Sequence, residues 1–211
     1  MKIAIVIGAT GLVGSELVNQ LLNSSEFSKV KIFVRKSTNK THTKLEEYIV
    51  DFEEIENWKQ ELSGDTLFSC IGTTLKTVGT KEKQFNIDYN YPLHTIQTAM
   101  SQGVNQIVLV SSMGAKAGSY NFYLDMKGKL EEAIKALQPK SLLIFRPSIL
   151  DGNRIEKRPA EHLAIKMMRF LGKLPFFKKY APTKIDTLAK NMIYNALKEK
   201  QIFKIYESTE I

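Results

Sequence analysis

Short apolar runs alternate with amphipathic stretches along most of the chain. After Lys2, residues 3–7 form a continuous apolar run typical of a buried strand, and leucines and valines recur at helical spacing over residues 12–23. The same pattern predicts strands at 2–7, 30–35, 48–51, 66–71, 105–111, 141–146 and 202–206, and helices at 12–23, 53–62, 83–102, 122–137, 160–171 and 185–199. Strands that alternate with helices predict an α/β protein whose doubly wound, mostly parallel sheet carries helices on both faces.

The length of 211 residues suits a single domain, which we expect to span residues 1–211. The stretch 151–184 breaks the alternation of strands and helices and is rich in Lys, Pro and Phe. Because it follows the sixth predicted strand, we expect it to form a small cap over the substrate within this domain. The sequence is compatible with a monomer and with a homodimer.

A glycine-rich segment follows the first predicted strand and leads into the first predicted helix. Its first glycine permits a tight turn, its second lets the backbone approach a ligand, and its third lets the helix pack close to the strand. The N–H groups and the dipole at the start of such a helix attract phosphate groups. The segment therefore predicts a dinucleotide-binding loop, although a tight turn without a ligand would leave the same pattern. The residues expected to contact the cofactor here are Gly8, Thr10, Gly11, Leu12, Val13 and Gly14.

The second predicted strand ends in Arg35 and Lys36, where domains that bind NAD usually carry an acidic residue for the ribose 2′-hydroxyl. A guanidinium binds a 2′-phosphate through paired hydrogen bonds, so the sequence favours NADP(H) over NAD(H). Arg35 at the start of a solvated loop is the alternative. Asp51 is expected either at the adenine end of the cofactor or as a turn residue. Gly72 and Thr73 form a turn of small residues that lets the cofactor pass.

Two serines and a Tyr-x-x-x-Lys pair form the candidate catalytic group. Ser111 and Ser112 end the strand at 105–111, and Tyr123 and Lys127 follow in the next predicted helix. Residues four apart share a helix face, so the Lys127 ammonium is expected near the Tyr123 phenol, where it favours the phenolate. Such a phenol can pass a proton to a substrate oxygen held by Ser112. A helix with Lys127 in solvent would show the same spacing, but the order of the three motifs favours catalysis.

Taken together, these motifs resemble the short-chain dehydrogenase/reductase superfamily, and more narrowly its atypical branch that contains the HIV Tat-interacting protein family and bacterial relatives. The matching segments are 8–14, 71–74, 111–115, 121–124, 127–131 and 145–147. The resemblance implies a Rossmann fold, NADP(H) binding and the catalytic positions Ser112, Tyr123 and Lys127. Asp88 departs from the pattern, because extended-type enzymes generally keep an asparagine of the proton relay there. Further cofactor contacts implied by the resemblance are Ser111, Tyr123, Lys127, Pro147, Ser148 and Ile149.

The function that these motifs favour is an NADP(H)-dependent oxidoreductase that reduces a small carbonyl substrate. The main alternative is an NADP(H)-binding regulatory or redox-sensing protein that acts through a protein partner with little or no turnover. A third reading keeps the cofactor but performs epimerisation or dehydration by transient oxidation. Because a sensor needs no tyrosine and lysine pair, the sequence favours catalysis.

The composition argues against several other classes of protein. Hydrophobic residues make up 43% and charged residues 25% of the chain, which is ordinary for a globular protein. The net charge is +8, but the basic residues are scattered, so no nucleic-acid partner is expected. His42, His94 and His162 form no metal pattern with Cys70, the single cysteine. No apolar run approaches the roughly 18 residues that a membrane span requires, and we expect a cytoplasmic protein.

Overall fold

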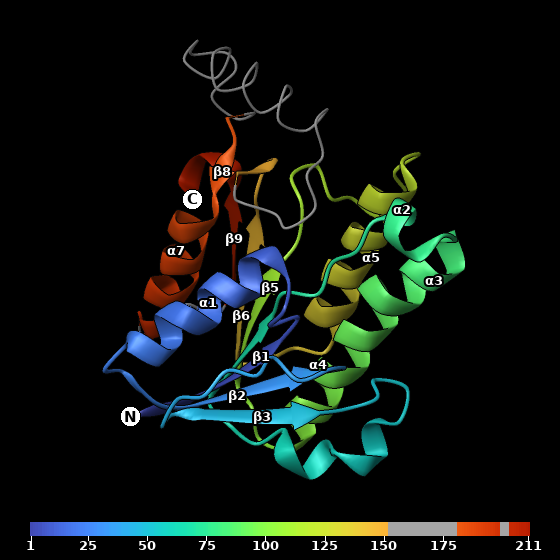
Figure 1. The fold of residues 1–211 in the computed structure, drawn as a ribbon. Helices are drawn as coiled ribbons and strands as arrows, with labels where there is room; N and C mark the ends of the chain where they lie inside the picture. Colours follow the sequence, from blue (N-terminus) through green and yellow to red (C-terminus); the bar gives the residue numbers. More distant parts are fainter. Residues whose placement is uncertain (152–180, 199–202) are drawn as a thin grey trace.

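Seven parallel strands form one sheet in the order β3-β2-β1-β4-β5-β6-β9. The structure is a computed structural model that describes residues 1–151, 181–198 and 203–211 (Figure 1). The strand order changes direction beside β1, so the predicted doubly wound Rossmann fold is confirmed, and its ligand site belongs at the carboxyl ends of β1 and β4. The strands are β1 (Lys2–Ile7), β2 (Phe27–Val34), β3 (Leu45–Ile49), β4 (Thr66–Ser69), β5 (Gln106–Val110), β6 (Ser141–Arg146) and β9 (Phe203–Glu207).

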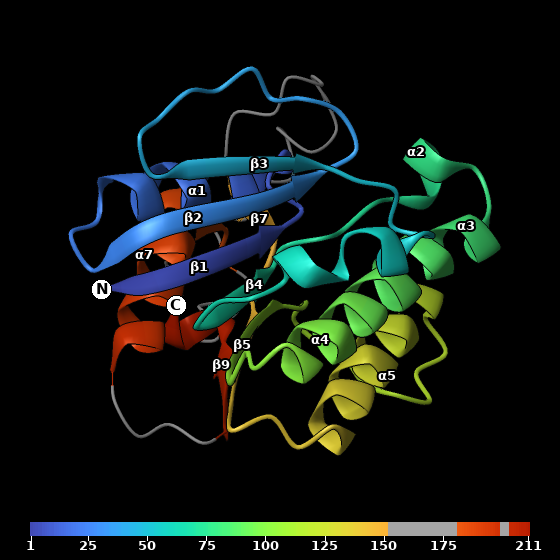
Figure 2. The same cartoon turned by 90° about the horizontal axis from the view of Figure 1, so that it is seen from below.

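Two hydrophobic cores lie on opposite faces of the sheet, because alternate residues of each strand point to opposite sides. Ala4 and Val6 pack with the helices α1 (Leu12–Asn23) and α7 (Ile185–Leu197). Ile5 and Ile7 pack on the other face with α4 (Tyr91–Ser101) and α5 (Phe122–Ala136). Figure 2 shows α1 and α7 on one side of the strands and α4 and α5 on the other. Burial on both faces explains why the strands read as nearly continuous apolar runs.

The helix predicted at 53–62 is wrong. Two short 3₁₀ helices, η1 (Ile55–Asn57) and η2 (Lys59–Glu61), occupy this segment. Trp58 and Leu62 are buried against the sheet, and the Trp58 indole N–H donates to the Asp51 carbonyl at 2.8 Å. The spacing of these two buried residues is also helical, so the apolar pattern alone could not distinguish the two 3₁₀ turns from one regular helix.

The helix predicted at 83–102 is divided into three parts: α3 (Lys81–Phe85), a π-helical turn η3 (Asn86–Asn90) and α4. Pro92 lies in the first turn of α4 and has no N–H group to donate to the carbonyl four residues earlier. The Tyr91 N–H instead donates to the Asn86 carbonyl, five residues back. The chain therefore keeps its helical course but widens around Asp88.

Several short elements carry no periodic pattern and were not predicted. These are the helix α2 (Leu75–Val78), the two-stranded parallel sheet of β7 (Leu150–Asp151) and β8 (Thr183–Lys184), and the final turn η5 (Ser208–Glu210). The helix predicted at 160–171 and most of the predicted cap at 151–184 lie outside the described residues. No helix in the described ranges is long and apolar enough to cross a membrane.

Candidate functional site

The turn between β1 and α1 places glycines where side chains would not fit. Gly8 has φ +77°, and a Cβ at Gly8 would lie 2.5 Å from the carbonyl carbon of Cys70. A Cβ at Gly14 would lie 2.2 Å from the Gly8 carbonyl oxygen, so α1 packs directly against the turn. The Gly11 N–H donates to the same oxygen at 3.0 Å and closes the turn. The glycines therefore bring the start of α1 close to the ends of β1 and β4.

The start of α1 is open to a ligand. Gly11 is the N-cap, no side chain caps the helix, and both Thr10 and Gly11 are exposed. The first N–H groups of a helix, here from Leu12 onward, have no partner within the helix. Val13 points the other way and is buried in the core. These backbone donors and the positive end of the dipole fit the pyrophosphate of a dinucleotide.

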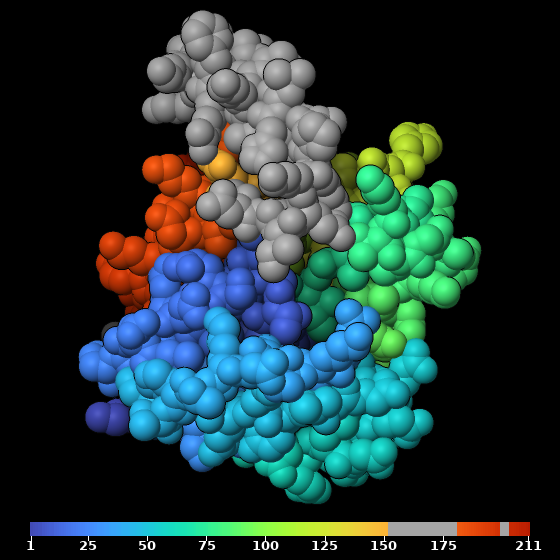
Figure 3. All heavy atoms as spheres, viewed as in Figure 1, coloured from blue at the N-terminus to red at the C-terminus, as the bar shows by residue number. Residues whose placement is uncertain are grey.

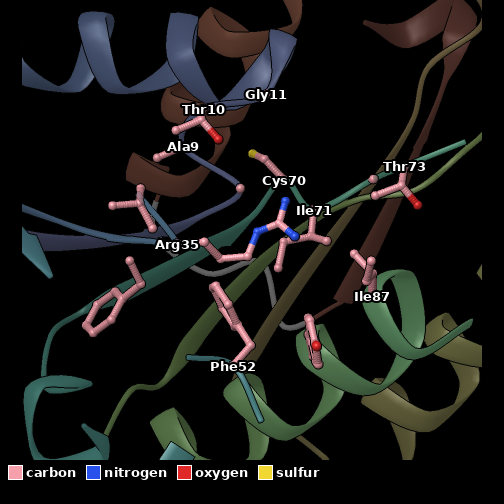
Figure 4. Close-up of a pocket in the computed structure, with 14 residues that line it drawn as sticks. Ala9, Thr10, Gly11, Arg35, Phe52, Cys70, Ile71, Thr73 and Ile87 are labelled. Atoms are coloured by element: carbon pink, nitrogen blue, oxygen red, sulfur yellow. The ribbon is translucent and has the colours of Figure 1, made fainter. Parts of the chain in front are cut away.

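A cleft opens beside this loop, at the carboxyl ends of β1, β2 and β4. Figure 3 shows the surface hollowed between the dark blue N-terminal residues and the green residues of α2 and α3. The Arg35 side chain extends across the cleft between the glycine loop and Phe52 (Figure 4). Lys36 is exposed and does not line the cleft. The lining residues are Gly8, Ala9, Thr10, Gly11, Phe33, Val34, Arg35, Phe52, Cys70, Ile71, Gly72, Thr73, Ile87 and Tyr91.

Asp51 acts as a turn residue in the structure. Its carboxylate accepts the Glu53 N–H at 3.0 Å, and it does not line the cleft. The neighbouring Phe52 lines the cleft and stacks on Tyr91, with ring centroids 5.4 Å apart. The Tyr91 hydroxyl donates to Glu53 at 2.9 Å, and burial together with this bond raises the pKa of Tyr91 to about 12. Sequence reasoning missed both aromatic residues, because only the strand order brings the two segments together.

Asp88 holds the loop that follows β4. Its carboxylate is fully buried and accepts the Thr73 N–H at 2.8 and 3.0 Å and the Thr73 hydroxyl at 2.8 Å. Gln84 donates to the Thr73 carbonyl at 3.3 Å. A Cβ at Gly72 would meet no protein atom within 4 Å, so this residue borders open space in the cleft. The departure noticed in the sequence therefore has a local role, which is to fix Thr73 at the cleft wall.

The candidate catalytic residues lie around the carboxyl ends of β4 and β5. Lys127 is 2% exposed, and its ammonium donates to the carbonyl of the cleft residue Ile71 at 3.2 Å. Tyr123 lies one turn earlier on α5 and is half-buried, and the Ser112 hydroxyl donates to the Met113 carbonyl at 3.4 Å. Among the described residues, no hydrogen bond joins the side chains of Ser112, Tyr123 and Lys127. Tyr123 and Lys127 share a face of α5, as predicted from their spacing. The hydrogen bond from Lys127 goes to Ile71, which lines the cleft.

Ser111 belongs to a partly buried network of charges. Its hydroxyl, expected among the cofactor contacts, donates to the carboxylate of Glu131 on α5. The Arg146 guanidinium binds Glu131 through two nitrogens and Glu207 through a third, at 2.9 Å. Glu131 is 6% exposed. The neighbouring carboxylates, Glu131 first, raise the pKa of Arg146 further above its usual value, so this cation stays charged. Sequence reasoning missed Glu131.

The segment after β6 lies beside the serine loop, residues 111–121 between β5 and α5. The Met113 N–H donates to the Pro147 carbonyl at 2.9 Å, which ties the residue after Ser112 to this segment. The Ser148 N–H donates to the Thr183 hydroxyl at 3.2 Å, and Ile149 is exposed. These bonds place residues 147–149 at the same end of the sheet as Ser112.

Cys70 lines the cleft, and burial raises the pKa of its thiol to about 12, with Lys127 opposing the shift. A thiol held in its protonated form is a poor nucleophile, so the site does not suit thiol catalysis. Within the part of the chain that the structure describes, no group of three His, Cys, Asp or Glu side chains could hold a metal ion.

Comparison with known proteins adds independent information. Residues 8–159 match the family described as NAD(P)H-binding. The protein HTATIP2 of Rattus norvegicus is 33% identical over 178 residues, which cover 82% of this chain and 72% of that protein. The protein FMP52-1 of Scheffersomyces stipitis is 31% identical over 219 residues and covers 99% of this chain and 96% of that protein.

The similarity to solved structures concerns the fold. The UDP-glucose 4-epimerase of Thermotoga maritima superposes with a TM-score of 0.73 at 15% identity, over 97% of this chain and 75% of that one. At this identity the match confirms the Rossmann fold.

The expectation of a cytoplasmic protein is wrong by these comparisons. The Scheffersomyces stipitis relative is named as mitochondrial, and further fungal relatives carry the same designation. Composition and the lack of a long apolar run could not distinguish between these compartments.

Proposed function

Because the chain belongs to the NAD(P)H-binding family, within the HTATIP2-like atypical branch of the short-chain dehydrogenases/reductases, we propose that it is an NADP(H)-dependent oxidoreductase that reduces a small carbonyl substrate. One observation carries this proposal. The buried ammonium of Lys127 reaches the carbonyl of Ile71, in the same cleft that the glycine loop and Arg35 line. A cofactor laid along this cleft would run from Arg35 toward Lys127.

The proposed cofactor contacts divide the cleft into two ends. The open start of α1 receives the pyrophosphate, and Arg35 binds the 2′-phosphate through charge-assisted hydrogen bonds. No acidic side chain lines the cleft in the described residues, so no carboxylate there would repel this phosphate. Gly72 and Thr73 leave room for the chain of the cofactor to pass toward α5.

The protein side chains would orient the substrate and transfer the proton. Bound NADPH supplies the hydride. Ser112 donates a hydrogen bond to the substrate carbonyl oxygen, and the Tyr123 hydroxyl gives its proton to that oxygen. The Lys127 ammonium, one helical turn from Tyr123, stabilises the negative charge left on the phenol. The carbonyl of Ile71 holds Lys127 in place.

Titration of the purified protein with NADPH and with NADH tests the cofactor assignment. Replacing Arg35 by Ala removes charge-assisted bonds worth about 1.5–3 kcal/mol, so NADPH affinity should fall about 10- to 100-fold while NADH affinity changes little. Lys36→Ala is the matched control, because the adjacent Lys36 does not line the cleft and should lose much less. Absence of binding by both nucleotides, or equal losses for both in the Arg35 variant, would contradict the proposal.

Turnover is tested separately with 4-nitrobenzaldehyde and diacetyl as carbonyl probes. The Tyr123→Phe variant should keep NADPH affinity within about twofold and lose at least about 100-fold in the oxidation rate of NADPH. Retention of the rate in this variant would refute the proton-transfer role. Tight NADPH binding without turnover of any carbonyl compound would favour the regulatory alternative.

A further inference from the structure

Glu131 connects three segments that approach the proposed nicotinamide end of the cleft. It lies on α5, accepts the Ser111 hydroxyl at the end of β5, and pairs with Arg146 at the end of β6. The bond from the Arg146 Nε to Glu131 is 3.0 Å long. Ser111 directly precedes Ser112, and Arg146 directly precedes Pro147. One carboxylate therefore holds both strand ends against the helix that carries the Tyr-x-x-x-Lys pair.

The spacing along α5 places this anchor on the catalytic face. Tyr123, Lys127 and Glu131 are four residues apart, so successive turns of one face carry them. The contact between this helix and the serine loop is close. A Cβ at Gly128 would lie 2.2 Å from the carbonyl carbon of Lys116. A shift of α5 relative to β5 would therefore move the serine loop and Lys127 together.

The energetics favour a positional role over a stabilising one. The side chains of Glu131 and Arg146 are 7% and 20% exposed, and an ion pair so largely removed from water gains little net stability, because the loss of hydration offsets most of its Coulomb energy. Apolar side chains of similar volume would fill the same space without this cost. What they cannot supply is the directional set of bonds through which Glu131 fixes Ser111 and Arg146 at once.

We propose that Glu131 is a positioning residue that aligns the ends of β5 and β6 with α5 and so shapes the nicotinamide end of the site. This inference rests on the proposed function, because it assumes a bound NADPH. Glu131 does not line the cofactor cleft, so it acts through its bonds to Ser111 and Arg146 and through the position of α5, which carries Lys127. The adenine and 2′-phosphate end, with Arg35, lies on the β2 side of the sheet and does not depend on Glu131.

Two ligands distinguish this role from general support of the fold. NADPH spans the whole cleft, whereas 2′-phospho-ADP-ribose contains the adenine, 2′-phosphate and pyrophosphate but no nicotinamide. By calorimetry, Glu131→Gln should weaken NADPH binding about tenfold and change 2′-phospho-ADP-ribose binding less than about twofold. Glu132→Gln is the matched control, because Glu132 is exposed and adjacent, and it should alter neither affinity.

Each outcome decides the question. Equal losses for the two ligands would show general support of the fold and overturn the inference, as would unchanged affinities. If Glu131→Gln does not fold, Ser111→Ala removes one bond with the ion pair intact and should weaken NADPH selectively by about threefold. If Ser111→Ala binds each ligand as tightly as the unmodified protein does, the inference is also overturned. Failure of the unmodified protein to bind NADPH would refute the proposed function itself, and the inference with it.

Discussion

Gly72 offers a way to block the cofactor without disturbing the protein. It lines the cleft, its φ is not in the left-handed region, and a Cβ there would meet no protein atom within 4 Å. In the Gly72→Val variant, the added carbons would therefore project into the space through which the proposed cofactor passes. We expect the fold to tolerate this change and NADPH binding to fail.

The expected effect follows from the free energy of unfolding without and with NADPH. Without ligand, replacing this glycine should change the free energy of unfolding by no more than about 1 kcal/mol, because no clash forms and the unfolded chain loses some freedom. NADPH at about 100 times its Kd stabilises the unmodified protein by about 2.7 kcal/mol, which raises Tm by about 5–10 °C in a chain of this size. If Gly72→Val weakens binding about 100-fold, the same NADPH concentration gives only about 0.4 kcal/mol, or about 1 °C.

Thermal unfolding followed by circular dichroism, with and without NADPH, measures both quantities. Gly128→Ala is a contrasting variant, because its Cβ would overlap the backbone of Lys116 outside the cofactor cleft. It should lower Tm in the absence of NADPH, which Gly72→Val should not. The proposed path of the cofactor would be refuted if Gly72→Val had the Tm of the unmodified protein without NADPH and NADPH still raised its Tm by about 5–10 °C.

Three further predictions concern residues around the same cleft. Asp88→Asn leaves one acceptor oxygen for the bonds from Thr73, so the free energy of unfolding, measured in urea, should fall by about 1–3 kcal/mol. Titration with NADPH should show a weaker affinity. An unchanged free energy of unfolding would contradict the role of Asp88. Gly14→Ala places a Cβ 2.2 Å from the Gly8 carbonyl oxygen and should cost about 1–3 kcal/mol in the same assay, since α1 must move. The folded chain holds the Cys70 proton more tightly than the unfolded chain, with a pKa of about 12 against 9.0. The stabilisation that comes from this raised thiol pKa is therefore complete below pH 9.0 and falls as pH rises toward 12, by at most about 1.4 kcal/mol per pH unit. A Cys70→Ala variant should lose less stability over this range, and parallel losses would disprove the shift.

The sequence predicts the elements that bury an unbroken apolar pattern. Residues 2–7 and 141–146 match β1 and β6, and the helix predicted at 12–23 matches α1. The failures have local causes. Trp58 and Leu62 have the spacing of a helix face but lie on two 3₁₀ turns, a difference that periodicity does not reveal. Pro92 lacks the N–H that a regular turn at Asp88 requires. Two-residue strands such as β7 carry no periodicity that a sequence could reveal.

The cofactor loop could be anticipated because one short segment contains all its glycines. The wall opposite the loop could not. On that wall Phe52 and Tyr91 stack on each other, although the chain between them includes β4 and five short helical segments. Their contact depends on β4 lying next to β1, which no local pattern encodes.

The same dependence on strand order explains the partly buried network of Ser111, Glu131, Arg146 and Glu207. Arg146 and Glu207 are direct register partners on β6 and β9, and Ser111 follows Val110, which pairs with Phe145. Parallel pairing therefore brings three polar residues from distant parts of the sequence to one edge of the sheet. Glu131, from the helix that crosses this end of the sheet, binds both Ser111 and Arg146. Its place one turn after Lys127 means that the strand order and the helix register must both be correct for the proposed site to bring Ser112 and Lys127 to one ligand.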